Sequence, residues 1–371
     1  MMKELKILWL INRKNIKYHL LFGVLLLVTL MTVIGNMKYP SNPLIEKSLL
    51  ERQATNRVLE GFLKMDIESR QAKEDPLYLS LVKQSELLSQ QELMLLIDDR
   101  ENYLERSLAL VEEREAFYHI YQSELYQTLI PIRSQNDRDR VFYQKMKDDT
   151  IPLEKTTASL AASIPKVLLI LSILWFPLTA LVTSNIFTDE LEHQSIREGI
   201  PSRRVEKMVF KIIFTLGSFL IAFLLVIILM LFLGLVFSFG DLNYPIGIYT
   251  FHNTTVPIWL YIIIVFSYFL FIGLFSTCLS FSLNVLTKNS FITFFISLFL
   301  YASFYLMPEI MTKLNLFPTV YLQTATVLNG ELSQGLPFLN LYFAIMILLM
   351  YSGICLLVVR VFGLKKVGER R

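Results

Sequence analysis

The hydrophobic positions of this chain gather in six long runs, separated by segments in which polar and charged residues dominate. A helix that crosses a bilayer needs about 20 consecutive apolar residues. The six runs approach or exceed this length, and they cover residues 18–35, 164–187, 208–237, 258–281, 291–307 and 338–361. The pattern therefore predicts an all-α integral membrane protein with six transmembrane helices.

The segment between the first two runs, residues 37–163, follows a different pattern, with 22 acidic and 17 basic residues. Apolar residues recur in it every seven positions, and a second set lies beside them; together these are Ile97, Leu104, Val111, Tyr118 and Leu125 with Leu96, Tyr103, Leu110 and Phe117. This spacing predicts one long helix over residues 91–129 with a single apolar stripe. Strand alternation and hairpin dipeptides are rare in the segment, so we expect a large all-helical domain. We expect the stripe to pack on neighbouring helices of that domain, with an intermolecular coiled coil as the alternative.

Residues 1–17 are amphipathic, with basic side chains on one helical face and apolar side chains on another. The pattern predicts a helix lying in the membrane interface, with its basic groups toward anionic lipid headgroups. The alternative is a plain extension of the first span. The residues that define the interfacial helix are Lys3, Lys6, Trp9, Arg13 and Lys14.

Lysine and arginine are unevenly shared among the short loops. They are frequent before the first run, between the second and third runs and after the last run, whereas the two short loops of the opposite side contain Lys313 alone. Basic loops face the cytoplasm. We therefore place both termini in the cytoplasm and residues 37–163 outside the cell. Because the basic residues flank apolar runs, they do not form a nucleic-acid patch.

The loop after the second run, "TDELEHQSIREGIPSRRVEKMVFK" at residues 188–211, contains ten charged residues. Asp189 can cap a helix, and Glu192 stands three residues later as its partner in a capping box. Gly199 and Pro201 are typical of a helix end. The loop therefore predicts a short helix near residues 189–200 on the cytoplasmic side.

Catalytic and metal-binding patterns are missing from the sequence. The four histidines have no metal-ligand spacing, and the two cysteines, Cys278 and Cys355, lie inside apolar runs. No phosphate-binding Walker loop occurs. The apolar runs carry almost no ionisable residue away from their ends, which argues against an ion-coupled carrier. We expect no catalytic residue, no metal and no cofactor on this chain.

The chain resembles the membrane subunit of an ABC-2-class (type V) ABC exporter. The resemblance rests on Glu192, Ser195, Pro201, Arg203 and Arg204, followed by Lys207 or Lys211, and on the six-run pattern with an amphipathic N-terminus. Gln194 departs from the family, which often has glycine there. The segment "MTKLNLFPTVYLQTATVLNG" resembles the short re-entrant helices that precede the last span of this family.

The resemblance implies a permease without its own nucleotide site. Its charged loop would be a coupling helix that docks on a separate ABC ATPase, present in two copies, which binds ATP and Mg. A second permease, identical or homologous, would complete the exporter. The implied coupling residues are Glu190, Glu192, Ser195, Arg197, Glu198, Gly199, Pro201, Arg203 and Arg204.

The cargo expected from the apolar spans is amphipathic or hydrophobic, with a peptide preferred and a lipid or drug as alternatives, exported across a bacterial cell membrane. Two other functions are compatible with the sequence. One is a membrane sensor whose extracellular domain binds a ligand. The other is an intramembrane enzyme, which would need several polar groups converging at one depth.

Overall fold

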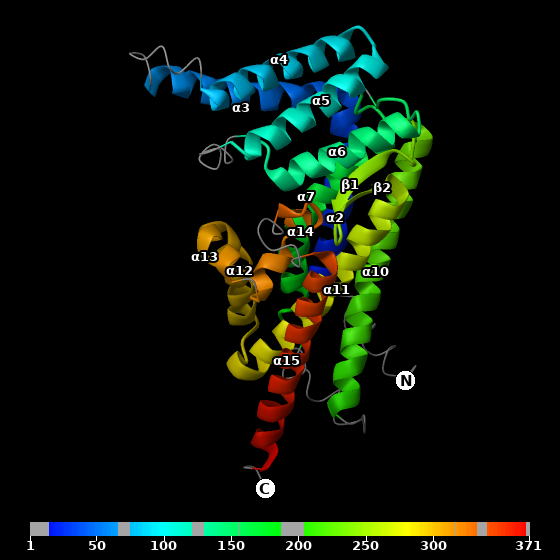
Figure 1. Ribbon diagram of the computed structural model, residues 1–371. Coiled ribbons are helices and arrows are strands. Elements are labelled where there is room, and N and C mark those ends of the chain that lie inside the picture. The colour runs from blue at the N-terminus through cyan, green and yellow to red at the C-terminus, as the bar shows by residue number, and fades with distance from the viewer. Residues whose placement is uncertain are drawn as a thin grey trace.

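The computed structural model describes residues 15–65, 75–120, 130–154, 156–186, 204–314, 316–331 and 340–368. Most of these residues are helical. Helices α3, α4, α5 and α6 lie at one end of the molecule, across the long axis of the remaining helices (Figure 1). Helix α10 begins, and helix α15 ends, at the opposite end.

Five described helices are long and apolar enough to cross a membrane. The chain is therefore a multi-pass membrane protein by the length and composition of its helices. These helices are α2 (Ile16–Lys38), α7 (Leu160–Thr183), α10 (Arg204–Val236), α11 (Ile258–Thr287) and α15 (Leu341–Gly368). The remaining predicted run forms α12 (Ser290–Leu306), which has 17 residues and is at the lower limit for a span.

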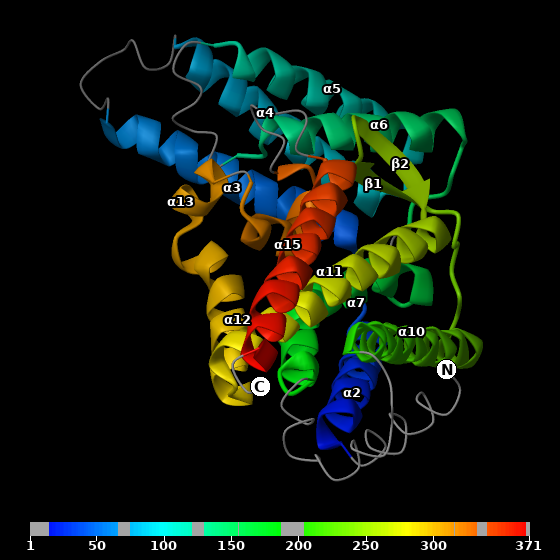
Figure 2. The ribbon, with the colours of Figure 1, turned by 90° about the horizontal axis from the view of Figure 1, so that it is seen from below.

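Helix α11 lies among α7, α12 and α15 (Figure 2). Trp175 of α7 is fully buried, and its ring stacks on Phe269 of α11 with centroids 5.2 Å apart. The indole N–H of Trp175 donates to the carbonyl of Phe269 at 2.7 Å. Phe223 of α10 completes this contact, 4.6 Å from the Trp175 ring. Large aromatic rings with one satisfied polar group thus hold three of the membrane-length helices together.

Three short helical pieces, α13 (Pro308–Lys313), η3 (Pro318–Leu322) and α14 (Thr324–Leu328), lie between α12 and α15. Every residue of η3 is buried, and the Tyr268 hydroxyl on α11 donates to the Tyr321 carbonyl at 2.6 Å. The sequence predicted short broken helices in this segment, and the structure has them.

The α3–α6 unit consists of α3 (Pro43–Met65), α4 (Pro76–Leu96), α5 (Arg100–Tyr118) and α6 (Arg133–Asp148). The predicted single helix over residues 91–129 is wrong, because α4 ends at Leu96 and α5 begins at Arg100. Asp98 adopts a left-handed φ of 65°. Asp99 then caps α5 by accepting from the Asn102 amide at 3.1 Å. Two consecutive aspartates therefore turn the chain, although the apolar repeat continues through them.

The apolar stripe nevertheless packs inside the unit, as expected, over its described part. Tyr103, Leu104 and Val111 are buried with Tyr143 of α6 in one hydrophobic cluster. Ile97 stands at the turn and is 60% exposed. The continuation of the stripe at residues 121–129 lies outside the described residues.

The all-α expectation misses one β-hairpin. Strands β1 (Pro245–Tyr249) and β2 (Asn253–Pro257) pair in antiparallel register, with Gly247 opposite Thr255. Isoleucine, threonine and valine favour strands, but the segment also contains proline and glycine, and it was expected to be a plain loop. The hairpin packs against α6, and β2 leads directly into α11.

Candidate functional site

The predicted coupling residues lie almost entirely outside the described part of the chain. This applies to Glu190, Glu192, Ser195, Arg197, Glu198, Gly199, Pro201 and Arg203, whereas Arg204 is the first residue of α10. The predicted interfacial residues Lys3, Lys6, Trp9, Arg13 and Lys14 also lie outside it. What the structure describes is the base from which the charged loop departs.

That base, which we call the loop base, joins the end of α7 to the first turns of α2 and α10. The Lys17 ammonium group on α2 donates to the Ser184 hydroxyl, the C-cap of α7, at 3.0 Å. The Lys211 ammonium group on α10 donates to the carbonyl of Ile186. Lys211 is only 8% exposed, so its side chain is buried at this contact and does not extend into solvent. The chain segments on both sides of residues 187–203 therefore lie side by side.

Helix α11 also contributes to the loop base through hydroxyl groups. The Thr183 hydroxyl lies 2.8 Å from the Ser280 hydroxyl and 3.3 Å from that of Ser276. All three residues are buried. Sequence reasoning missed these residues, because serine and threonine in an apolar run give no signal of their partners. A displacement of the charged loop would thus act on α2, α7, α10 and α11 together.

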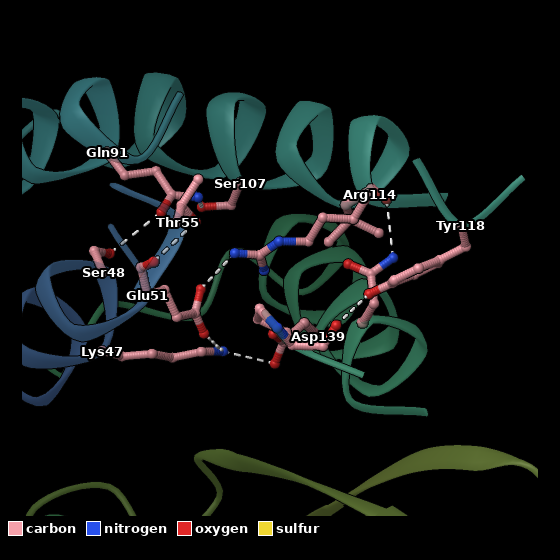
Figure 3. Close-up of polar contacts among 12 residues, drawn as sticks. Lys47, Ser48, Glu51, Thr55, Gln91, Ser107, Arg114, Tyr118 and Asp139 are labelled. Carbon is pink, nitrogen blue, oxygen red and sulfur yellow. Dashed lines mark hydrogen bonds and ion pairs between the residues drawn. The ribbon is translucent and has the colours of Figure 1, made fainter. Parts of the chain in front are cut away.

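The α3–α6 unit contains a second polar cluster, the charged core (Figure 3). The Arg114 guanidinium of α5 donates to the Glu51 carboxylate of α3 at 2.8 Å. The Lys47 ammonium group of α3 donates to the Asp139 carboxylate of α6 at 2.7 Å and lies 4.0 Å from Glu51. Arg114 is 1% exposed. The four side chains alternate in charge and connect three helices.

Electrostatics favour the charged forms of Glu51 and Lys47 in the charged core. Burial opposes the charged form of Glu51, but Arg114 and Lys47 outweigh it and hold the pKa of the Glu51 carboxyl below its ordinary value. Burial also opposes the charged form of Lys47, yet Asp139 and Glu51 raise the pKa of its ammonium group. Each charge faces an opposite charge, so the cluster is suited to joining helices and not to proton transfer.

A separate chain of buried hydrogen bonds, beside the charged core, attaches α4 to α3 and α5. The Ser48 hydroxyl donates to the Gln91 side-chain oxygen at 3.2 Å, and the Gln91 amide donates to the Ser107 hydroxyl at 3.0 Å (Figure 3). The Asn136 amide of α6 donates to the Val111 carbonyl at 3.0 Å. Buried polar contacts therefore connect each of the four helices of the α3–α6 unit to at least one other.

The chain matches no family model, no curated protein and no solved structure in the comparisons made. Among the described residues, no three His, Cys, Asp or Glu side chains come together as a metal site. Cys278 and Cys355 are both buried and unbridged.

An apolar groove lies between α2 and α10. Its lining consists of one glycine and seven large apolar residues: Gly23, Leu26, Leu27, Leu30, Leu225, Ile228, Leu229 and Phe232. Gly23 leaves it open, since no atom lies within 4 Å of the position a Cβ would take. A groove of this composition on two membrane-length helices fits hydrocarbon and offers no polar group for a hydrophilic solute.

Proposed function

We propose that the chain is the permease subunit of an ATP-driven ABC exporter of the ABC-2 class, located in a bacterial cell membrane. Hydrolysis occurs on a separate ABC ATPase, present in two copies with ATP and Mg, and a second permease completes the assembly. In this proposal α12 is the remaining span, both termini are cytoplasmic, and the α3–α6 unit is extracellular.

The loop base carries the proposal. A coupling element must pass a displacement at the cytoplasmic face to several membrane helices at once. Lys17 and Lys211 attach the residues just before the charged loop, Ser184 and Ile186, to α2 and α10, and Thr183 adds α11. A solvated loop without a mechanical role would need no such attachment.

The cargo we propose is amphipathic or hydrophobic, with a peptide preferred over a lipid or a drug. Support comes from the membrane-length helices, whose buried polar side chains are mainly hydroxyls, many of them hydrogen-bonded to carbonyls of the same helix. The groove between α2 and α10 agrees with an apolar cargo or with a bound lipid chain. A buried acid or base of the kind that couples transport to ions is not needed when ATP supplies the energy.

The test is co-purification of an ABC ATPase with the full-length protein from its own membrane, followed by charge reversal in the loop. The double variant Glu192→Lys/Glu198→Lys should weaken ATPase binding by on the order of 100-fold, because mismatched interface charges cost a few kcal/mol. The matched control is Glu105→Lys, an exposed carboxylate on α5 at the other end of the molecule. Unchanged ATPase binding and export in the double variant would contradict the proposed coupling role.

The alternative function is a membrane sensor whose α3–α6 unit binds an extracellular ligand. The size of this unit and its buried polar contacts favour a role beyond capping the spans. A sensor would purify without an ATPase, so the same co-purification separates the two functions.

A further inference from the structure

Helix α6 contacts two parts of the molecule through consecutive residues. Asp139 belongs to the charged core and pairs with Lys47 of α3. Arg138 leaves the α3–α6 unit, and its guanidinium donates to the carbonyl of Asn329, directly after α14, at 2.6 Å. This bond joins residues 191 positions apart, and it connects α6 to the segment that leads to α15.

Two glycines permit this contact. A Cβ on Gly247 of β1 would lie 2.4 Å from the Arg138 Cγ, so only glycine lets the arginine stem cross the strand. Gly330 has a φ of 68°, and a Cβ there would lie 2.7 Å from the Cβ of Tyr249. The hairpin is therefore packed between α6 on one side and the residues after α14 on the other.

The hairpin is continuous with the membrane helices of the C-terminal half. Strand β2 ends at Pro257 and α11 begins at Ile258. Phe251, at the hairpin turn, stacks on Tyr342 of α15 with ring centroids 4.9 Å apart. A shift of α11 or α15 must therefore move the hairpin or break its contacts with α6.

The covalent connections of the α3–α6 unit are made to other helices, α2 and α7. There the Asn36 amide donates to the Ser163 hydroxyl at 3.2 Å, and the Lys166 ammonium group donates to the Asn36 side-chain oxygen at 3.0 Å. The Thr157 amide donates to the Ser41 carbonyl at 2.9 Å. Among the described residues, the unit is thus attached covalently to α2 and α7, and α6 attaches it non-covalently to the hairpin and to the segment after α14. Arg138 and the Phe142–Tyr244 ring contact, with centroids 5.9 Å apart, both belong to this second attachment.

We propose that Arg138, Gly247, Tyr249, Asn329 and Gly330 form a joint through which α11 and α15 move the α3–α6 unit. The charged core keeps the unit internally rigid, so a displacement at the joint tilts the unit about its attachment to α2 and α7. Arg138 acts as a positioning residue in this joint. It fixes where α6 lies on the hairpin, and among the residues that the structure describes it contacts none of the candidate coupling residues.

Hydrogen–deuterium exchange of the full-length protein tests the joint without reference to transport. Arg138→Gln removes a charge-assisted hydrogen bond, so exchange in residues 245–257 and 324–330 should become at least about ten-fold faster. The control Arg140→Gln removes a charge from the same helix, and the ion-pair partners of Arg140 among the described residues are Glu115 and Asp137. It should leave both segments unchanged. Equal exchange in these segments for wild type and Arg138→Gln overturns the joint.

A glycine variant distinguishes a local effect at the joint from a general folding defect in the same exchange measurement. Gly247→Ala should accelerate exchange in the same two segments, because its Cβ displaces the Arg138 stem. Gly35→Ala is the matched control, since nothing lies within 4 Å of a Cβ in that position of α2. Faster exchange throughout the chain in Gly247→Ala, without a local maximum at the joint, contradicts the proposal.

The movement itself is tested on export, and this arm rests on the proposed export function. Arg138→Gln should reduce ATP-driven export at least about ten-fold while ATP hydrolysis continues, because α11 and α15 can no longer move α6 through the hairpin. The control Arg140→Gln should export normally. Full export by Arg138→Gln overturns the movement. If no ATPase associates with the chain, the export function fails while the exchange result still decides the joint.

Discussion

The Glu51 carboxylate accepts a hydrogen bond from the Arg114 guanidinium at 2.8 Å across the contact between α3 and α5, 63 positions apart in the chain. Arg114 is 1% exposed, so neither water nor salt screens this pair effectively. Such a pair adds modestly to stability, but the loss of one partner leaves an uncompensated buried charge.

The first prediction concerns this pair. Arg114→Met should destabilise the α3–α6 unit by about 3–5 kcal/mol, because Glu51 keeps only the more distant Lys47. Amide exchange in α3 and α5 of the full-length protein should accelerate at least about 100-fold. The double variant Glu51→Leu/Arg114→Met should recover most of the protection, and Arg57→Met, on the exposed side of α3, should change little. A single variant as protected as the wild type would show that the pair does not hold these helices.

The second prediction concerns pH. The pKa of Glu51 in the folded protein lies below its ordinary value, because Arg114 and Lys47 outweigh the effect of burial. A carboxyl with a lowered folded pKa contributes stability that is fully present above its unfolded pKa of about 4.3 and is lost as pH falls through the folded value. Exchange protection of α3 and α5 should therefore decrease below about pH 4.3.

Glu51→Gln is the control for this pH effect. The variant should be less protected than the wild type at pH 7, and the difference should narrow as the pH falls, because protonated Glu51 and glutamine are both neutral. A difference between the two proteins that stays constant from pH 7 to pH 3 would assign the acid sensitivity to other carboxylates.

The positions of the membrane-length helices could be predicted from the sequence because a local property sets them. A run of about 20 apolar residues forms a helix wherever water is absent, whichever neighbours it acquires. The short broken helices before α15 were expected on another ground, the resemblance of their segment to the re-entrant helices of a known family. In the structure, Pro308 and Pro318 stand at the beginning of α13 and η3.

Other features could not be predicted, because they depend on contacts between distant segments. The apolar repeat runs through Asp98 and Asp99, so periodicity alone gave one helix where two aspartates form a turn and a cap. Lys47 and Asp139 are 92 positions apart, and Arg138 and Asn329 are 191 apart. Nothing in the local pattern indicates which of the many charged residues pair. The hairpin was missed since its strands are stabilised by packing on α6.

The third prediction concerns the orientation of the chain. If the α3–α6 unit is extracellular, Glu105→Cys on α5 and His252→Cys at the hairpin turn should react with an impermeant thiol reagent added to intact cells. Glu206→Cys, at the start of α10, should react only after permeabilisation. All three positions are exposed, and the native cysteines are buried, so the background should be low. Labelling of the α10 position in intact cells would reverse or refute the proposed topology.

The fourth prediction concerns the loop base. Lys211→Met removes the donor to the Ile186 carbonyl but retains an apolar side chain of similar length, so α10 should insert normally. The start of the charged loop would no longer be fixed to α10. In the proposed exporter, ATP hydrolysis by the bound ATPase should continue. The amount of cargo exported per ATP hydrolysed should fall at least about ten-fold, which corresponds to a loss of about 1.4 kcal/mol of coupling free energy.

A matched variant separates the loss of this anchor from the loss of a charge. Lys313→Met, at the end of α13, removes a lysine far from the loop base and should leave the ratio of export to hydrolysis unchanged. Lys211→Arg keeps a donor to the Ile186 carbonyl and should retain part of the coupling. Because hydrolysis and export are measured on the same purified complex, a fall in both would indicate failed assembly. Export that tracks hydrolysis in Lys211→Met as in the wild type would show that this lysine does not transmit the displacement.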